Sequence, residues 1–284
     1  MKQENTETKI IRCAMPLLVY ILINIVVQTV YSFVVLGKKL VEYGDEDAFD
    51  YMFAYNFSSH MQDVVAENSL SIVLISGIIM IPAGVFMMYK DSIRAGTYKV
   101  WKKFPDIKAM VYVFLIGIFA SMGISKLCTI LPLDGIWGSY EQVNNEFAAN
   151  SLAMQIIALV IFGPVTEEII FRGLIYNRLK GYMGDTMAPV YISAAVFGIY
   201  HFNLVQGIYG FLLGILLCAV MEKYGTVLAS MLLHMSANLM ALIMMYLPFS
   251  RSIEGNIYLK ILCMILELMA LAGVLWKVNS RKEA

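Results

Sequence analysis

The sequence is poor in charged residues. Only 15% of its 284 residues are charged, whereas 60% are hydrophobic and the mean hydropathy is +0.71. A soluble domain usually carries about 25% charged residues, so this composition excludes a soluble enzyme. The sequence also contains no soluble domain of any size and no signature of nucleic-acid binding.

Cysteines, metal-binding motifs and repeats are scarce as well. The four cysteines are scattered, each in a different apolar run, and predict neither disulfides nor a metal site. The sequence has no H-E-x-x-H motif and no internal repeat of the kind found in many transporters. A proton-coupled transporter is therefore disfavoured.

What the sequence does contain is a series of apolar runs of about 20 residues, the length that crosses a bilayer as a helix. These runs predict an all-α fold, a polytopic membrane helix bundle of about eight transmembrane helices. The predicted spans are Ile10–Leu36, Ser69–Tyr89, Met110–Ile130, Leu152–Tyr176, Met187–His201, Leu204–Met221, Thr226–Leu247 and Ile257–Trp276. The fifth span is short, and the three residues from His201 to Asn203 could form a sharp turn.

The basic residues are distributed unevenly between the loops. With the N-terminus inside, fifteen of the 21 Lys and Arg residues lie on the cytoplasmic side, five (including Lys126) lie outside, and Arg172 lies within a span. This asymmetry follows the positive-inside rule and predicts that both termini lie in the cytoplasm. The small size of the protein favours a bacterial plasma membrane.

We divide the chain into N-terminal spans (1–150), a core (151–247), and a last transmembrane helix with its tail (248–284).

Residues 165–174, VTEEIIFRGL, place three charges inside the fourth apolar run. Each charge costs at least about 2.5–3.5 kcal/mol at the centre of a bilayer. Glu168 and Arg172 are four residues apart on a helix and can form an ion pair, whereas Glu167 has no partner on its own helix. An unpaired buried carboxylate is either protonated or paired with a residue of another helix. Glu167 is therefore the candidate catalytic residue of this stretch.

Two of the three histidines also lie in apolar spans. His201 ends the stretch FGIYH and follows Phe197 by about one helical turn. His234 begins the stretch HMSAN, in which Asn238 lies on the same helix face. The third, His60, lies in the polar first loop and is assigned no role. Three spans thus each carry one polar cluster, and ionisable residues inside a membrane are usually functional.

These clusters resemble the three motifs of the CPBP family, also called Abi, which contains CAAX prenyl endopeptidases and bacterial bacteriocin-processing or self-immunity proteins. EEIIFR fits E-E-x-x-x-R, FGIYH fits F-x-x-x-H, and HMSAN fits H-x-x-x-N. The resemblance covers about residues 150–245. It implies an intramembrane endopeptidase that hydrolyses a peptide bond of a membrane-associated or lipidated protein or peptide. The alternative is a non-catalytic membrane scaffold or a bacteriocin self-immunity factor of the same fold.

The resemblance implies a role for each motif residue. Glu167 would be the general base, and His201 would position the water or share its proton. His234 and Asn238 would donate hydrogen bonds to the oxyanion of the tetrahedral intermediate.

Two further residues and the question of a metal complete the implied site. Glu168 and Arg172 would hold the helix of the first motif in register. Family members are often called metalloproteases, and a zinc ion, if one is bound, would be held by Glu167, His201 and His234. No cofactor is favoured, because Glu and His can activate water without an ion. The expected partners are the lipid bilayer and a membrane-bound peptide or protein substrate.

Overall fold

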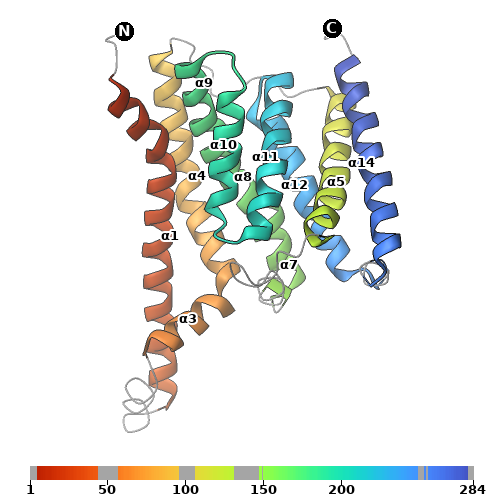
Figure 1. Cartoon of the computed structure of the whole chain (residues 1–284). Coiled ribbons are helices and arrows are strands. Elements are labelled where there is room, and N and C mark those ends of the chain that lie inside the picture. The colour runs from red at the N-terminus through yellow and green to blue at the C-terminus, as the bar shows by residue number, and fades with distance from the viewer. Residues whose placement is uncertain are drawn as a thin grey trace.

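The computed structural model describes residues 5–43, 57–95, 106–130, 147–148, 150–248, 253 and 255–280. Within these residues the structure is a bundle of helices without strands (Figure 1). Long helices lie at the predicted spans, namely α1 (Thr6–Tyr43), α4 (Ser69–Arg94), α5 (Ile107–Ile130), α11 (Leu204–Tyr224), α12 (Val227–Tyr246) and α14 (Ile257–Ser280). The predicted fold class, a polytopic membrane helix bundle, is confirmed.

The fourth predicted span is the central part of a longer composite helix from Leu152 to Met183. This helix consists of α7 (Leu152–Gln155), the π-helical segment η1 (Ile156–Phe162), α8 (Gly163–Glu168), the π-helical segment η2 (Ile169–Tyr176) and α9 (Asn177–Met183). It contacts α1, α4, α10, α11 and α12. The composite helix therefore carries the predicted glutamates into the middle of the bundle.

The fifth span is the short one, as predicted. In the described part of the chain seven helices are long and apolar enough to cross a membrane, whereas α10 (Ala188–Tyr200) has 13 residues. A helix of that length is about 20 Å long, shorter than the roughly 30 Å hydrocarbon core of a bilayer. The chain then turns sharply: Phe202 has a φ of 50°, and Asn203 Oδ1 caps α11 by accepting from the Gln206 N–H at 3.0 Å.

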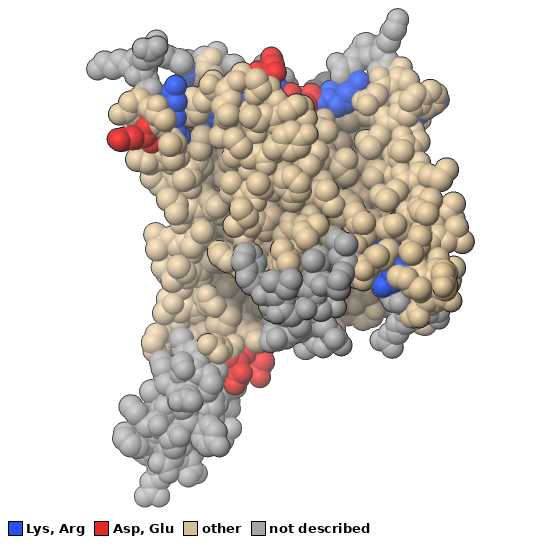
Figure 2. Space-filling model, in the orientation of Figure 1, with Lys and Arg blue, Asp and Glu red and all other residues tan. Residues whose placement is uncertain are grey.

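Both termini lie at the same end of the bundle (Figure 1). At the opposite end α1 extends beyond the other helices, and α3 (Phe57–Glu67) packs against it. On the face shown in Figure 2 the charged side chains gather at the two ends, with an uncharged belt between them. An uncharged belt of this kind is what a helix bundle presents to lipid tails.

Small residues let neighbouring helices approach closely. A Cβ atom on Gly117 of α5 would lie 1.9 Å from Ser236 Oγ and 2.4 Å from the carbonyl oxygen of Leu233, both on α12. Likewise, a Cβ atom on Gly198 of α10 would lie 2.5 Å from the carbonyl oxygen of Gly207 on α11. Close contact through small residues is the usual basis of helix packing in membranes. These contacts fix the two helices, α10 and α12, that carry the second and third motifs.

Lys126 corrects one part of the sequence analysis. It was counted as an outer charge, but it is buried in α5 and forms an ion pair with Glu267 of α14, with Nζ and Oε1 2.7 Å apart. Glu267 was overlooked because it is a single carboxylate in an otherwise apolar run. The last transmembrane helix therefore also carries a polar group into the bundle, and α5 packs directly against it.

The glycine contact between α5 and α12 generates the first prediction. Gly117→Ala should lower the free energy of unfolding by about 1–3 kcal/mol, because the added methyl group forces apart two closely packed backbones. Gly273→Ala on α14 is the matched control, since a Cβ atom there meets nothing within 4 Å. Melting temperatures of both purified variants in the same detergent measure the difference, and an equal effect of the two substitutions would contradict this packing.

Candidate active site

The three motifs meet around α8, the short α-helical segment between the two π-helical segments. Asn238 of α12 bonds to one of the carbonyls of η1. The Gly163 N–H donates to the carbonyl of Ala158, five residues back, and Pro164 has no N–H, so neither residue can donate to the carbonyl of Leu159. Instead Asn238 Nδ2 donates to Leu159 O at 2.8 Å. The π-helical register, which is rare and often found at functional sites, thus fixes the amide of the third motif.

The predicted ion pair of the first motif is present and fully buried. Arg172 Nη1 lies 3.0 Å from Glu168 Oε1, and both side chains have 0% exposure. Arg172 Nη2 also donates to the carbonyl of Gly214 on α11 at 3.2 Å. Its guanidinium lies over the ring of Phe197 at 4.5 Å, within range of a cation–π interaction. Three helices therefore hold the arginine in place.

Glu168 has a second partner that the sequence did not reveal. Its Oε1 also lies 2.9 Å from Nδ1 of His234, on α12. A carboxylate that is paired with an arginine only accepts hydrogen bonds, so Nδ1 of His234 carries the proton. This bond orients the imidazole and points its other nitrogen, Nε2, towards Glu167.

Glu167 is the partly open member of the cluster. Its side chain is 17% exposed, and its Oε2 lies 3.7 Å from Nε2 of His234. No residue of its own helix pairs with it in the described structure. The sequence left two alternatives open for Glu167, a protonated carboxyl group and a partner from another helix, and His234 of α12 is the nearest candidate for such a partner. A separation of 3.7 Å is too long for a direct hydrogen bond, so the two groups face each other across a short gap.

His201 lies at the C-terminal end of α10, beside the cluster. Its Nδ1 is 2.8 Å from the carbonyl oxygen of Phe197. The ring of Phe197 packs edge-on against His201, with ring centres 5.0 Å apart, and against His234, with ring centres 5.7 Å apart. No ion pair joins His201 to Glu167 among the described residues. The ring of Phe197 therefore lies between the two histidines, His201 and His234.

The structure thus brings Glu167, Glu168, Arg172 and His234 into one cluster, with Asn238 and His201 at its borders. Gly214 was not predicted to belong to the site. A Cβ atom at this position would lie 3.1 Å from Arg172 Nη2, so a side chain there would crowd the guanidinium. The spacing of Gly207, Gly210 and Gly214 along α11 was the available signal. His60 lies in α3, and its side chain is outside the described part of the chain.

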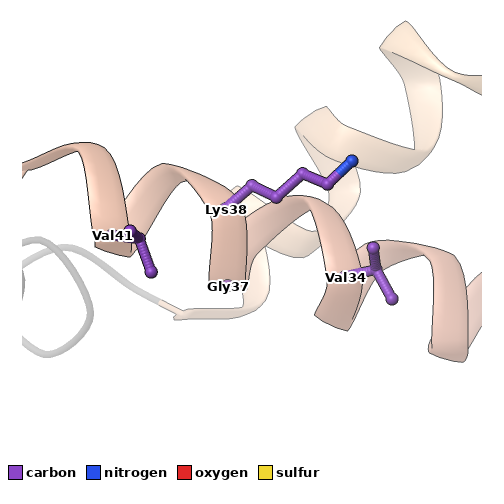
Figure 3. Close-up of a pocket in the computed structure, with 4 residues that line it drawn as sticks. All are labelled: Val34, Gly37, Lys38 and Val41. Atoms are coloured by element: carbon purple, nitrogen blue, oxygen red, sulfur yellow. The ribbon is translucent and has the colours of Figure 1, made fainter.

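A surface hollow and the metal hypothesis complete the description of candidate sites. The hollow drawn in Figure 3 is lined by residues of α1 alone: Val34, Gly37, Lys38 and Val41. None of them belongs to a motif, so this hollow is not the site. In the part of the chain that the structure describes, no three His, Cys, Asp or Glu side chains are arranged to hold a metal ion.

The buried pair generates the second prediction. Glu168→Gln leaves Arg172 without its counter-charge in the interior, and breaking a buried pair costs about 3–5 kcal/mol of stability. The double substitution Glu168→Gln/Arg172→Met should recover part of that loss, because no charge is then left alone. Melting temperatures in detergent measure both effects.

The matched control is Glu222→Gln, which breaks the ion pair between Glu222 and Lys180 at the surface. Exposed pairs contribute only about 0–1 kcal/mol, so this variant should melt close to the wild type. A Glu168→Gln protein as stable as the control would show that the buried pair does not stabilise the fold.

The comparisons with known proteins agree with this arrangement. Residues 149–240 match a family model described as type II CAAX prenyl endopeptidase Rce1-like. None of the curated proteins and none of the solved structures that were compared with the chain matches it. The matched segment contains all three motifs and the whole cluster around Glu168. The match confirms the resemblance that the motifs indicate: residues 149–240 are similar to the CAAX-type membrane proteases of the CPBP family.

Proposed function

We propose that the protein is an intramembrane endopeptidase that hydrolyses a peptide bond of a membrane-associated peptide or protein. The observation that carries the proposal is the pair formed by Glu167 and His234. They come from different helices, face each other at 3.7 Å, and are backed by the buried Glu168 and Arg172. A partly open carboxylate beside an oriented imidazole is an arrangement suited to general acid–base chemistry.

The depth of this pair indicates the class of substrate. Glu167 lies near the middle of the helix from Leu152 to Met183, which has 32 residues. A scissile bond must therefore reach the interior of the bilayer, where polar peptide groups are costly to desolvate. A segment that is apolar or carries a lipid meets that requirement at the lowest cost. We therefore propose that the substrate is an apolar or lipid-modified peptide. We also propose that the enzyme lies in a bacterial plasma membrane with both of its termini in the cytoplasm.

The first step is the attack of water on the peptide carbonyl. Glu167 accepts a proton from the water, and the water oxygen forms a bond to the carbonyl carbon. His201, at the border of the cluster, positions this water, in keeping with the role of the second motif in the family. The electron pair of the carbonyl double bond moves to its oxygen and produces the oxyanion.

The oxyanion is stabilised from α12. The Glu168 carboxylate accepts a hydrogen bond from Nδ1 of His234 and orients the imidazole, and the proposed mechanism uses the form in which Nε2 also carries a proton. That proton and the second N–H of the Asn238 amide donate to the oxyanion. Collapse of the intermediate breaks the C–N bond, and the proton held by Glu167 passes to the leaving amine. No step requires a metal ion.

The third prediction concerns the base. Glu167→Gln keeps the size and hydrogen-bonding capacity of the side chain but removes the base, so cleavage should fall by at least about 10²–10⁴-fold. The protein should still fold, because no partner on the same helix loses its counter-charge. The measurement is the cleavage rate of two fluorogenic peptides of one sequence, one prenylated and one unmodified, by purified protein in detergent micelles.

Glu222→Gln, the surface variant, serves as the control and should cleave at the wild-type rate. If Glu167→Gln cleaves like the wild type, the base is another group. If the folded wild type binds both peptides but cleaves neither, the proposal gives way to the alternative, a non-catalytic scaffold or self-immunity factor.

The fourth prediction concerns metal dependence. Because Glu167 and His234 act without an ion in this mechanism, strong chelators should leave the cleavage rate unchanged. The check is cleavage before and after chelation, together with elemental analysis of the purified protein. One zinc per chain that is lost in His201→Ala or His234→Ala, together with loss of activity on chelation, would contradict the metal-free mechanism.

A further inference from the structure

The turn between α10 and α11 contains a residue in an unusual backbone conformation. Phe202 has a φ of 50°, and in the part of the chain that the structure describes it is the only residue other than glycine with a positive φ. A left-handed conformation brings the Cβ atom too close to the following carbonyl oxygen, and it is rare for bulky residues. The phenylalanine therefore destabilises the turn that contains it.

Two other helices end with glycine in this conformation. Gly184 follows α9 with a φ of 73°, and Gly225 follows α11 with a φ of 63°. Glycine is the usual residue after a helix that ends in this way, because it has no Cβ atom. A glycine would also fit at position 202 without strain, so the phenylalanine at the end of α10 calls for an explanation.

The residues on both sides of Phe202 are fixed by their own contacts. His201 ends α10, and its Nδ1 lies 2.8 Å from the carbonyl oxygen of Phe197. Asn203 is 6% exposed, and its side chain caps the first turn of α11. The chain reverses direction between these two anchored residues. A strained residue that its surroundings hold in place beside a motif histidine is the kind of outlier that points to a function.

The side chain of Phe202 contributes little to the core. It is 76% exposed, whereas Phe197, five positions earlier, is 1% exposed. A phenylalanine stabilises a fold mainly through the apolar area that it buries. Packing within the protein therefore does not explain why phenylalanine, and not glycine, occupies the turn.

The turn lies within the depth of the membrane. α10 begins shortly after Asp185, whose side chain is 90% exposed, and reaches the turn after 13 residues, a length of about 20 Å. The turn therefore lies inside a hydrocarbon core of roughly 30 Å, above the lower ends of α7 and α12 in Figure 1.

This depth indicates what the exposed ring faces. Non-helical backbone inside a membrane occurs only where it is buried in protein or lines a cavity. The cluster beside His201 has an opening, because the side chain of Glu167 is 17% exposed. An exposed residue of the turn is therefore expected to line this opening, next to the second motif.

We propose that Phe202 is a specificity-determining residue whose ring contacts the apolar or lipid-modified part of the substrate. An aromatic ring suits this contact because it offers a large apolar surface. Phe202 is bonded to His201, so a substrate that rests on the ring lies beside the second motif. This inference rests on the proposed endopeptidase function, and it names the turn between α10 and α11 as a surface that recognises the substrate.

The experiment replaces Phe202 by glycine. Phe202→Gly relieves the left-handed strain and removes the ring, so the melting temperature in detergent should be equal to or above that of the wild type. The Kd of the prenylated peptide should nevertheless rise about 10- to 100-fold, the range expected when the burial of one phenylalanine is lost. Binding is measured by fluorescence anisotropy in the Glu167→Gln background, in which the peptide stays intact.

Ile199→Ala is the matched control. Ile199 lies one turn earlier on α10, is 68% exposed and has an ordinary helical backbone. Its replacement removes a similar exposed apolar side chain and should leave both the Kd and the melting temperature at the wild-type values. Phe202→Ala keeps a Cβ atom in the strained position but removes the ring, so it should weaken binding as much as Phe202→Gly does.

The outcomes separate this inference from the proposed function. An unchanged Kd in both Phe202 variants, or an equal loss of binding in Ile199→Ala, would overturn the role of Phe202 and leave the function intact. A Phe202→Gly protein that melts well below the wild type would show that the ring serves the fold. If the wild type binds the peptide without cleaving it, the proposed function fails, whereas the anisotropy measurement still decides whether Phe202 contacts the peptide.

Discussion

The buried ion pair between Glu168 and Arg172 is the interaction on which the rest of the site depends. Two charges with 0% exposure inside a membrane bundle are tolerated only because each neutralises the other at 3.0 Å. The pair then connects three helices, since Arg172 bonds to α11 through Gly214 and Glu168 bonds to α12 through His234. These two contacts hold α11 and α12 against the composite helix at the site.

Because Glu168 is occupied, the two adjacent glutamates have different environments. Glu168 has two partners, both with short contacts to Oε1, and holds Arg172 and His234 in place. Glu167, one residue earlier, is partly open, and its Oε2 faces Nε2 of His234 at 3.7 Å. The α-helical segment α8 points the two side chains in different directions. The local geometry of one short segment thus separates a structural carboxylate from a chemically available one.

Features that depend on local spacing could be predicted from the sequence. The apolar runs gave the positions of the helices because span length is set by the bilayer. The spacing of Glu168 and Arg172 gave their contact because residues four apart share a helix face. The turn at His201-Phe202-Asn203 was predictable from the shortness of α10 and the polar residue that caps α11.

Features that depend on tertiary contacts could not be predicted. The bond from His234 to Glu168 joins residues 66 positions apart, and the pair of Lys126 with Glu267 joins residues 141 apart. The π-helical segments lay hidden in an ordinary apolar run, although Pro164 gave a hint of an irregular helix.

The central claim is that this cluster hydrolyses a peptide bond with a water molecule activated by Glu167. Mass spectrometry of the products formed by wild type and Glu167→Gln in H₂¹⁸O, with hydroxylamine present, tests it most directly. The account predicts two fragments from the wild type alone, with ¹⁸O in the new carboxylate and no hydroxamate. Hydroxamate formation would reveal a covalent acyl-enzyme and contradict direct attack by water, and equal fragments from both proteins would contradict the role of Glu167.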